Sequence, residues 1–425
     1  MNFKPAIFAA LAVGLASQAF AAVIGTNVPA TPLTAARVES LPAWKSYFEK
    51  SQRQRQADQD FLRAELKANG MTEATFPDET HNAGGVALDK PADWYAGDEA
   101  RHIADVVVSF QTPAGGWSKN SDYTGKPRSP GEMFGVENGS LYLGTNDFDM
   151  PNDPHWSYVG TFDNDATTTE LFFLAKVISS AKNGNTAWNK SFMRGLDYVF
   201  ASQFPSGGWP QVWPLQGGYH DEITINDDAM LHGLELLHDT AGGQNEFSFV
   251  PRRARKEAAA SFQRGMDCLL AVQAVVNGKR TVWCQQNDAI TLQPASARNY
   301  EMPSLASSES ANIMQFLMNL ANPNSKEVAA VHAACDWFEK TKIMGWEYRR
   351  TGDEGRKLVA APGSGPIWAR YYEIGTDKPI FGDRDKSIHD DVNELSRERR
   401  NGYGWYRDGP KQVLEQYADW VKAHP

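Results

Sequence analysis

The sequence predicts a mainly α-helical protein, an (α/α) toroid of repeated helix pairs with short β-hairpins and long loops at its mouth. Apolar residues recur at helical spacing in several successive segments. A Gln and a turn containing Gly and Trp close several of these segments, so the helices form a repeat of unequal period. Because repeated helix pairs bury their apolar faces as an inner and an outer layer, a toroid accommodates them within one domain.

Segments of helical character run along most of the chain. We expect helices over residues 39–69, 98–111, 166–182, 189–203, 228–240, 255–273, 308–320 and 325–342. Asp165 or Thr167 is expected to cap the start of the third of these helices, since both residue types are favourable N-caps. Short strands are expected in the turns, for example at 209–215 and 281–285. The long loops are where function usually resides on a rigid body, and they cover 86–95, 119–162 and 360–388.

The recurring turn has two interpretations. The sequence QTPAGGW begins at Gln111 and QFPSGGW begins at Gln203, while weaker copies end near Trp283 and Trp346. In the first interpretation, glycine ends the helix in a left-handed conformation and the Trp fills the gap between neighbouring helices. In the second, the Trp and the residues after it line the mouth of the toroid, where aromatic planes stack on sugar rings.

The composition excludes several classes of protein. The chain has 425 residues, 22% charged residues and a formal net charge of -10. This mixture is not typical of a disordered chain or a collagen-like fibre. An acidic chain is a poor candidate for nucleic-acid binding, because neutralising phosphates requires a basic surface. A polyanionic ligand would therefore need a local basic cluster on an acidic body.

The N-terminus has the features of a secretory signal. Residues 1–22 contain Lys4, then an apolar stretch, then small residues. The apolar stretch is shorter than the roughly 20 residues of a membrane-spanning helix, and no later stretch is apolar enough to span a bilayer. We expect cleavage to leave residues 23–425 as a single domain. This domain would be a secreted or periplasmic monomer with no membrane or nucleic-acid partner.

The three cysteines leave two alternatives open. Cys268 and Cys284 could form a disulfide, which would leave Cys335 unpaired. Equally, all three could be small core residues. Neither alternative provides a cysteine cluster with metal-ligand spacing.

Two Asp-rich segments stand directly before predicted helices. The sequence TFDNDAT contains Asp163 and Asp165, and ITINDDAM contains Asp227 and Asp228. One segment of this kind would predict only a helix cap, because Asp and Asn suit the N-terminal end of a helix. Two segments with more acid than a cap requires favour a shared calcium site. Calcium prefers oxygen ligands, and two Asp leave coordination positions for water and substrate.

Three arginines stand in polar or aromatic surroundings of unusual composition. Arg298 lies in ARNYEMPS, Arg370 in WARYYE and Arg384 in FGDRDK. Arginines in aromatic surroundings often clamp a carboxylate or pair with a buried acid. Glu373 and the Asp residues on either side of Arg384 are near enough in sequence to be such acids, so both interpretations stay open.

Together these motifs resemble those of the family 10 pectate lyases, pectin-degrading enzymes of bacteria. The resemblance covers about residues 92–406. It rests on GGWSKN at 115–120, GGWPQ at 207–211, both Asp segments, the Arg298 segment and the stretch 368–385. It implies a toroidal catalytic domain that cleaves α-1,4-linked polygalacturonate (pectate) with calcium, by anti β-elimination, to 4,5-unsaturated oligogalacturonates.

The resemblance also implies roles for individual residues. Asp163 and Asp227 correspond to the family's calcium-binding aspartates, and Arg298 corresponds to the arginine proposed as the catalytic base. The implied substrate-binding residues are Lys119, Arg370 and Arg384. The chain departs from the usual family pattern at Ser118 and Phe162, and neither position carries charge.

These residue types suit an elimination. The reaction removes the C5 proton, which is α to a carboxylate, and cations at that carboxylate stabilise the developing charge. An arginine has an ordinary pKa above ~12, so it is a poor base at neutral pH. Neighbouring cations would lower the pKa of Arg298. We therefore expect activity that rises into alkaline pH.

Other classes stay open on the residues alone. A glycoside hydrolase on the same toroid would use two carboxylates and leave the arginines without a role. A lyase of another uronic-acid polysaccharide would share the same site. A triterpene cyclase has similar Gln and Gly-x-Trp repeats, but the export signal and the arginines argue against it. A non-catalytic carbohydrate-binding protein would bind sugar and release no product.

Overall fold

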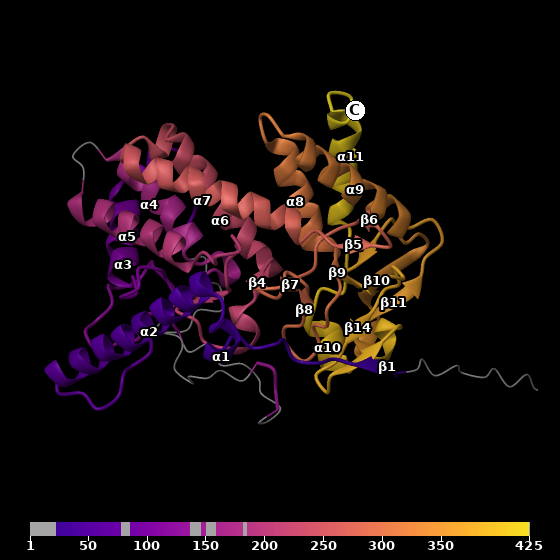
Figure 1. The fold of residues 1–425 in the computed structure, drawn as a ribbon, viewed down its shortest axis with the longest axis horizontal. Helices are drawn as coiled ribbons and strands as arrows, with labels where there is room; N and C mark the ends of the chain where they lie inside the picture. The colour runs from indigo at the N-terminus through magenta and orange to yellow at the C-terminus, as the bar shows by residue number, and fades with distance from the viewer. Residues whose placement is uncertain (1–22, 78–85, 137–145, 150–158, 182–184, 425) are drawn as a thin grey trace, which may run out of the picture.

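The structure is a computed structural model that describes residues 23–77, 86–136, 146–149, 159–181 and 185–424 (Figure 1). The helices are α1 (Ala35–Val38), α2 (Pro42–Ala68), α3 (Asp98–Ser109), α4 (Thr168–Ser180), α5 (Thr186–Ser202), α6 (Ala229–Gly242), α7 (Arg252–Ala271), α8 (Ser307–Asn319), α9 (Ser325–Thr341), α10 (Arg397–Gly402) and α11 (Gly409–Trp420). The mainly α-helical toroid is confirmed. The predicted signal, residues 1–22, lies outside the described residues.

The strands are short and join neighbouring repeats. They are β1 (Val23–Thr26), β2 (Gly160–Thr161), β3 (Val212–Trp213), β4 (Ile223–Thr224), β5 (Val275–Val276), β6 (Lys279–Arg280), β7 (Gln286–Asn287), β8 (Pro294–Ala295), β9 (Leu305–Ala306), β10 (Trp346–Arg350), β11 (Arg356–Ala360), β12 (Trp368–Ala369), β13 (Tyr371–Tyr372), β14 (Phe381–Gly382), β15 (Ser387–His389) and β16 (Tyr406–Arg407). Antiparallel pairs β2–β3, β4–β7 and β9–β13 each connect segments from different repeats.

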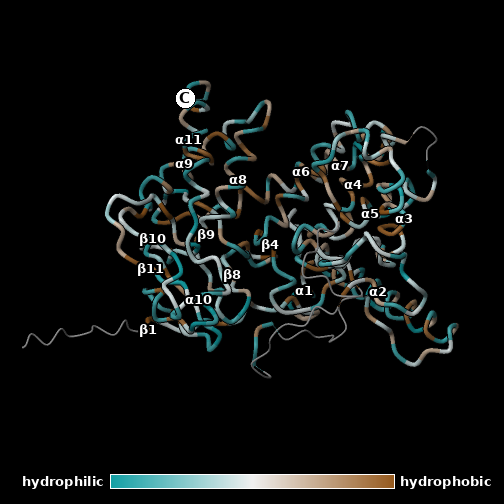
Figure 2. Tube along the Cα trace, turned by 180° about the vertical axis from the view of Figure 1, so that it is seen from behind, coloured by the Kyte–Doolittle hydropathy of each residue, from teal (hydrophilic) through white to brown (hydrophobic). Residues whose placement is uncertain are grey.

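The helices are arranged in pairs around the ring. Helices α4 and α5 pack together, as do α6 with α7 and α8 with α9. In Figure 1, α3 to α7 occupy one half of the molecule and α8, α9 and α11 occupy the other. Figure 2 shows polar and apolar residues alternating along the helices, as expected where one face of each helix is buried.

The recurring Gln forms hydrogen bonds both within its own turn and to a helix of the next pair. Gln111 Nε2 donates to Gly115 O at 2.7 Å and to Ser191 O, on α5, at 2.9 Å. Gln203 makes the equivalent two bonds at 2.8 and 2.9 Å, and Gln273 makes them at 3.0 Å each. The bridges run from α3 to α5, from α5 to α7 and from α7 to α9, so these helices are successive neighbours in one layer.

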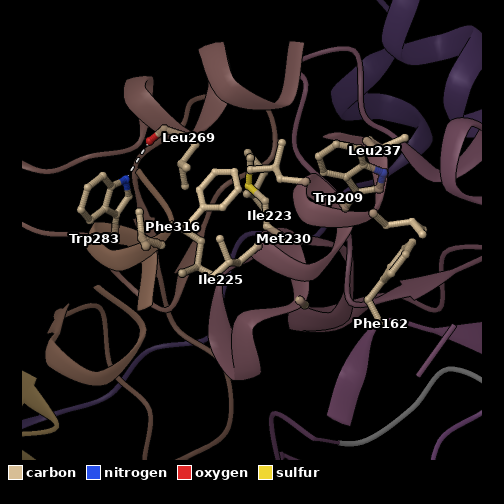
Figure 3. Close-up of a cluster of buried hydrophobic side chains, with 14 of the residues drawn as sticks. Phe162, Trp209, Ile223, Ile225, Met230, Leu237, Leu269, Trp283 and Phe316 are labelled. Carbon is tan, nitrogen blue, oxygen red and sulfur yellow. Dashed lines mark hydrogen bonds between the residues drawn. The ribbon is translucent and has the colours of Figure 1, made fainter. Parts of the chain in front are cut away.

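The tryptophans of the turns are core residues. Trp117, Trp209, Trp283 and Trp368 are at most 1% exposed. Each indole Nε1 donates to a backbone carbonyl of the preceding helix, at 2.7 to 3.0 Å. Figure 3 places Trp209 and Trp283 in one apolar cluster and marks the bond from Trp283. The prediction of a gap-filling Trp is confirmed, and stacking of these indoles on sugar is excluded by their burial.

The glycines of these turns cannot be replaced without strain. Gly115 and Gly207 have φ of +109° and +99°, a conformation that residues with a Cβ rarely adopt. A Cβ at Gly115 would lie 2.5 Å from Arg194 O, and one at Gly207 would collide with Arg264 O. The close approach of helix and turn therefore requires glycine at both positions.

Several sequence-based expectations need correction. The fourth turn is built on Trp368, whereas Trp346 is 41% exposed and lies in the β10–β11 hairpin. No strand forms over 281–285; β6 ends before it and β7 begins after it. Helix α11 and the β10–β11 hairpin were not predicted, although Pro410 at the start of α11 and Gly352 and Gly355 in the hairpin turn were usable signals.

Within the described part of the chain, the structure tests the disulfide alternative and the expectation that no helix spans a membrane. All three cysteines are free and buried, so the disulfide alternative is wrong and the core alternative is confirmed. No described helix is long and apolar enough to cross a membrane.

Candidate active site

The residue two positions after each buried tryptophan reaches one central polar region. These residues are Lys119, Gln211, Gln285 and Arg370. Lys119 and Gln211 line a cavity of about 120 Å³. Gln285 and Arg370 donate to the side-chain oxygen of Asn226, on the cavity wall, at 2.5 and 3.1 Å. The repeated turns therefore place a lysine, two glutamines and an arginine in or beside one polar region.

The same cavity gathers most of the predicted site. Lys119, Asp163, Asp227 and Arg298 all line it, although they come from four separate parts of the sequence. Arg370 stands beside it, with Nη2 3.9 Å from Asp227 Oδ1. Five of the six predicted site residues are thus brought together.

Asp163 is fixed by its own segment and by a lysine. Its backbone N–H donates to Thr161 Oγ1 at 3.0 Å, and its carboxylate forms a salt bridge with Lys119 Nζ. Burial alone would raise the pKa of Asp163. The charges of Lys119 and Arg298 outweigh burial and hold that pKa below its ordinary value, so the carboxylate is ionised.

Asp227 has the opposite electrostatic environment. Its φ of +50° turns the segment sharply, and Asn226 Nδ2 donates to its Oδ2 at 2.6 Å. Burial and the neighbouring charge of Asp163 raise the pKa of Asp227 to about 6, although Arg370 partly opposes the shift. Two carboxylates that repel each other across a small cavity would be stabilised by a bound cation.

The two Asp segments provide the N-cap positions of α4 and α6 but make no side-chain cap hydrogen bond there. The N-cap of α4 is Thr167 and that of α6 is Asp228, and neither makes a side-chain cap bond. Asp228 Oδ2 accepts from Asn312 Nδ2 at 2.6 Å, and Asp165 Oδ1 lies 3.0 Å from His232 Nδ1. Asp165 and Asp228 line neighbouring cavities instead, so the carboxylates that face the central cavity from these segments are Asp163 and Asp227.

The donor chemistry fits calcium. Asp163 and Asp227 offer the carboxylate oxygens that calcium prefers. Within the described ranges, no group of three or more His, Cys, Asp or Glu side chains could hold a metal ion. A cation between these two aspartates would therefore depend on further ligands such as water or substrate, which agrees with an open site.

Arg298 is held by a buried glutamate three residues later. Its Nε donates to Glu301 Oε2 at 2.8 Å and its Nη2 donates to Oε1 at 2.6 Å. Burial alone would raise the pKa of Glu301, but Arg298 outweighs it and lowers that pKa to about 2. Burial alone would lower the pKa of Arg298, but Glu301 raises it well above its ordinary value. The pKa of Arg298 is therefore raised, whereas neighbouring cations were expected from the sequence to lower it.

A row of closely spaced polar side chains leads from Glu301 to Glu309. Tyr403 OH donates to Glu301 Oε1 at 2.6 Å and lies 2.5 Å from Tyr371 OH. Tyr371 OH donates in turn to Gln285 Oε1. Gln285 Nε2 then donates to Glu309 Oε1 at 3.0 Å. Glu301, which holds Arg298, is thereby connected through these side chains to Glu309.

Glu309 is the acid partner of Arg370. Arg370 Nη2 donates to Glu309 Oε1 at 2.7 Å, and its guanidinium lies 4.6 Å from the ring centroid of Tyr403. The partner is therefore a buried glutamate on α8, and the expected pairing with Glu373 is wrong.

Arg384 lies at the edge of the site. Its Nε and Nη2 pair with Glu398 at 2.9 and 3.1 Å, which corrects the expectation of an Asp neighbour. It is not among the residues that line the cavity. The guanidinium lies 5.5 Å from the centroid of the Tyr300 ring, and that of Arg298 lies 5.0 Å from the same ring. Arg384 is thus adjacent to Arg298 without entering the cavity.

Comparison with known proteins identifies this arrangement. The family profile described as pectic acid lyase matches residues 111–414, which span the four turns, both Asp segments and all three arginines. The chain belongs to the pectic acid lyase family. It is accordingly an enzyme of the pectate lyase class. Among curated proteins, no match was found.

Two solved structures are similar to this pectic acid lyase. One is the family 10 polysaccharide lyase from Cellvibrio cellulosa, with 33% sequence identity and a TM-score of 0.64. The other is a mutant of the family 10 polysaccharide lyase from the same organism in complex with trigalacturonic acid, with 32% identity and a TM-score of 0.64. Each comparison covers 79% of this chain and 98% of the other.

Several cavity residues of this pectic acid lyase were missed from the sequence. They are Asp149, Gln211, Tyr219, His220, Asn226, Gln286 and Glu301. The spacing of Glu301 three residues after Arg298 was a usable signal for an ion pair. Gln211 was also predictable, since it occupies the position that Lys119 has in the first turn. The others carry no local pattern that points to a site.

Proposed function

We propose that this pectic acid lyase cleaves α-1,4-linked polygalacturonate by calcium-dependent anti β-elimination and leaves 4,5-unsaturated oligogalacturonates. The observation that carries the proposal is the single cavity lined by Lys119, Asp163, Asp227 and Arg298. It combines two acids for a cation, a lysine for a carboxylate and an arginine for the C5 proton. The complex of a similar family 10 lyase with trigalacturonic acid supports the choice of substrate.

Asp163 and Asp227 would hold the calcium ion. Their carboxylates are the hard oxygen donors that calcium prefers, and burial together with their mutual repulsion raises the pKa of Asp227. Calcium bound there would neutralise the substrate carboxylate and make the C5 proton more acidic. The lysine that pairs with Asp163 would then be available to the substrate.

Arg298 would accept the C5 proton at Nη1. Its Nε and Nη2 donate to Glu301, so Nη1 is the nitrogen that this pairing leaves for a ligand. Since Glu301 raises the pKa of Arg298, the neutral form is scarce at neutral pH. The rate of elimination would therefore rise into alkaline pH.

The remaining cations would hold substrate carboxylates. Arg370 is fixed by Glu309 and lies beside Asp227, so it is oriented before substrate arrives. Arg384 pairs with Glu398 at the edge, and Lys119 faces the cavity itself. A chain of galacturonates would span these positions and place one carboxylate at each. The proposed enzyme acts outside the cytoplasm, as a secreted or periplasmic monomer, after loss of residues 1–22.

Product analysis tests this proposal. Polygalacturonate is incubated with the enzyme, with and without a calcium chelator, while ultraviolet absorbance and reducing ends are followed together. We expect both signals to rise in parallel, because elimination creates a conjugated 4,5-unsaturated end. We expect the chelator to abolish both signals and added calcium to restore them. Reducing ends without absorbance would indicate a hydrolase and overturn the proposal.

A further inference from the structure

Two glutamines in the cavity have an unsatisfied amide oxygen. Gln211 and Gln286 are 5% and 1% exposed, and both line the cavity of about 120 Å³. Within the part of the chain that the structure describes, the side-chain oxygen of neither residue has a hydrogen-bond partner. A buried amide oxygen without a partner is destabilising, so such groups usually meet a ligand or an ordered water.

Unlike these two amide oxygens, the charged and phenolic groups of the same cavity have partners within the protein. Asp163 pairs with Lys119, and Arg298 pairs with Glu301. Tyr219, which also lines the cavity, donates from its OH to Asp149 Oδ1 at 2.7 Å. The groups that would recognise charge are thus paired within the protein, whereas the two amides are left for an occupant of the cavity.

The backbone of Gln211 is held on both sides. Its N–H donates to His220 O at 3.0 Å, and its carbonyl accepts from Phe162 N at 2.9 Å and Thr161 Oγ1 at 2.8 Å. These bonds connect it to the segment that carries Asp163. The amide is therefore presented to the cavity from a rigid position.

Gln286 is held equally firmly on the other Asp segment. It lies in the centre of the sheet β4–β7–β8, where it is opposite Thr224 on one side and Ala295 on the other. Strand β4 leads directly into the Asp227 segment. One amide thus accompanies each of the two aspartates.

We propose that Gln211 and Gln286 bind ring hydroxyl groups of the galacturonate in the cavity, and so make the site selective for unsubstituted hydroxyls. This inference rests on the proposed function. A galacturonate residue within the polymer presents one carboxylate and two free hydroxyls. Cations match the carboxylate, whereas a neutral amide both accepts from and donates to a hydroxyl. A site built to hydrogen-bond a hydroxyl strongly rejects analogues in which that bond cannot form.

The test uses isosteric apolar variants. Gln211→Leu and Gln286→Leu remove the amides, and Gln216→Leu is the matched control. Gln216 is also buried and also has an unpartnered side-chain oxygen, but it is not among the cavity residues. Calorimetry measures the Kd of trigalacturonate, and separately of calcium, for each protein. Thermal unfolding verifies the fold.

We expect each cavity variant to bind trigalacturonate roughly 10- to 100-fold more weakly than the wild type, which is typical of losing a buried hydrogen bond. We expect the Kd of calcium to change less than about twofold, since an amide that contacts only sugar does not contribute to cation binding. The control should match the wild type in both. Should a leucine variant fail to fold, Gln211→Asn and Gln286→Asn shorten the amide and should weaken trigalacturonate binding in the same direction.

A second measurement addresses selectivity. The ratio of kcat/KM for polygalacturonate to that for its O-acetylated form should be high in the wild type and fall towards one in the cavity variants. Unchanged trigalacturonate affinity, or a loss confined to calcium affinity, would overturn the inference. If the wild type binds trigalacturonate but makes no unsaturated product, the proposed function fails while the variant affinities still decide the inference. A wild type that does not bind trigalacturonate overturns both.

Discussion

The four tryptophan turns share the same indole hydrogen bond, whereas the side chain that each turn sends towards the central polar region is a lysine, a glutamine or an arginine. In each turn a buried indole donates to the preceding helix at 2.7 to 3.0 Å. Two residues later, the side chain is Lys119, Gln211, Gln285 or Arg370. Repetition in the turns provides stability, and variation at this single position provides chemistry. Changes in the turns should therefore affect unfolding, and changes in the cavity should affect catalysis.

The largest effect is expected at Arg298, which lines the cavity and is held by Glu301. Arg298→Lys should lower kcat about 1,000-fold, because a lysine cannot place a nitrogen as Nη1 is placed while the Glu301 pairing is kept. KM for polygalacturonate should change less than about threefold. Steady-state kinetics of the variant measure both constants.

The control for this prediction lies in a turn. Arg194 Nη2 donates to Thr112 O at 3.0 Å, so Arg194→Lys alters an arginine of the scaffold. That variant should keep the wild-type kcat. A change confined to KM in Arg298→Lys would reassign Arg298 to binding.

Glu301 connects the two regions, since it is buried like the scaffold and orients a cavity residue. The pKa of Glu301 is about 2 in the folded protein, below its ordinary value near 4.3. Ionisation of Glu301 therefore stabilises the fold fully above about pH 4.3, and this contribution is lost as pH falls towards 2. At pH 7, Glu301→Gln should reduce the free energy of unfolding by roughly 3 kcal/mol.

Denaturant unfolding of both proteins across a pH series measures this difference. The gap between wild type and Glu301→Gln should narrow as the pH is lowered from 5 to 2. Because Glu301 raises the pKa of Arg298, the variant should also show its rise in kcat at lower pH than the wild type. If the difference in free energy of unfolding between the two proteins did not depend on pH, the ion pair between Arg298 and Glu301 would be contradicted.

The turns themselves are tested by two equivalent substitutions. Trp117→Phe and Trp209→Phe each remove an indole hydrogen bond and leave a small cavity in the core. Each should lower the free energy of unfolding by about 2 kcal/mol. The kcat of both should stay at the wild-type value at temperatures where they are folded. Unequal losses, or a large change in kcat, would show that the turns are not interchangeable scaffold.

The smallest effect is expected where one turn is given the polar residue of another. Lys119→Gln places in the first turn the amide that the second turn carries. The variant loses a cation for substrate, so KM should rise about tenfold. Lys126→Gln, an exposed lysine nearby, is the control and should behave as the wild type. An unchanged KM for Lys119→Gln would exclude Lys119 from substrate binding.

The sequence allowed the turns and the Asp segments to be predicted because their signals are local. Gln111 and Gln203 stand at fixed distances from a Gly-Gly-Trp, and the bonds they make within the turn span only four residues. The Asp segments contain more acid than a cap needs, and the structure finds no side-chain cap bond at Asp228.

The partners that hold the arginines, and some of the cavity residues, could not be predicted from local sequence. Arg370 pairs with Glu309, which lies on another helix and was not near it in sequence. Gln286 enters the cavity from a two-residue strand, which is too short to leave a pattern of alternation. Such partners depend on the packing of repeats against one another, and their choice is set by the tertiary structure.

Calcium binding by the cavity aspartates tests the central claim most directly. Calorimetric titration of calcium into the wild-type protein should give saturable one-to-one binding. Asp163→Asn and Asp227→Asn should each weaken it by about 100-fold or more, since each removes one of two charged ligands. Asp165→Asn should bind as the wild type does, because Asp165 lies outside this cavity. Full calcium affinity in Asp163→Asn and Asp227→Asn would contradict the account.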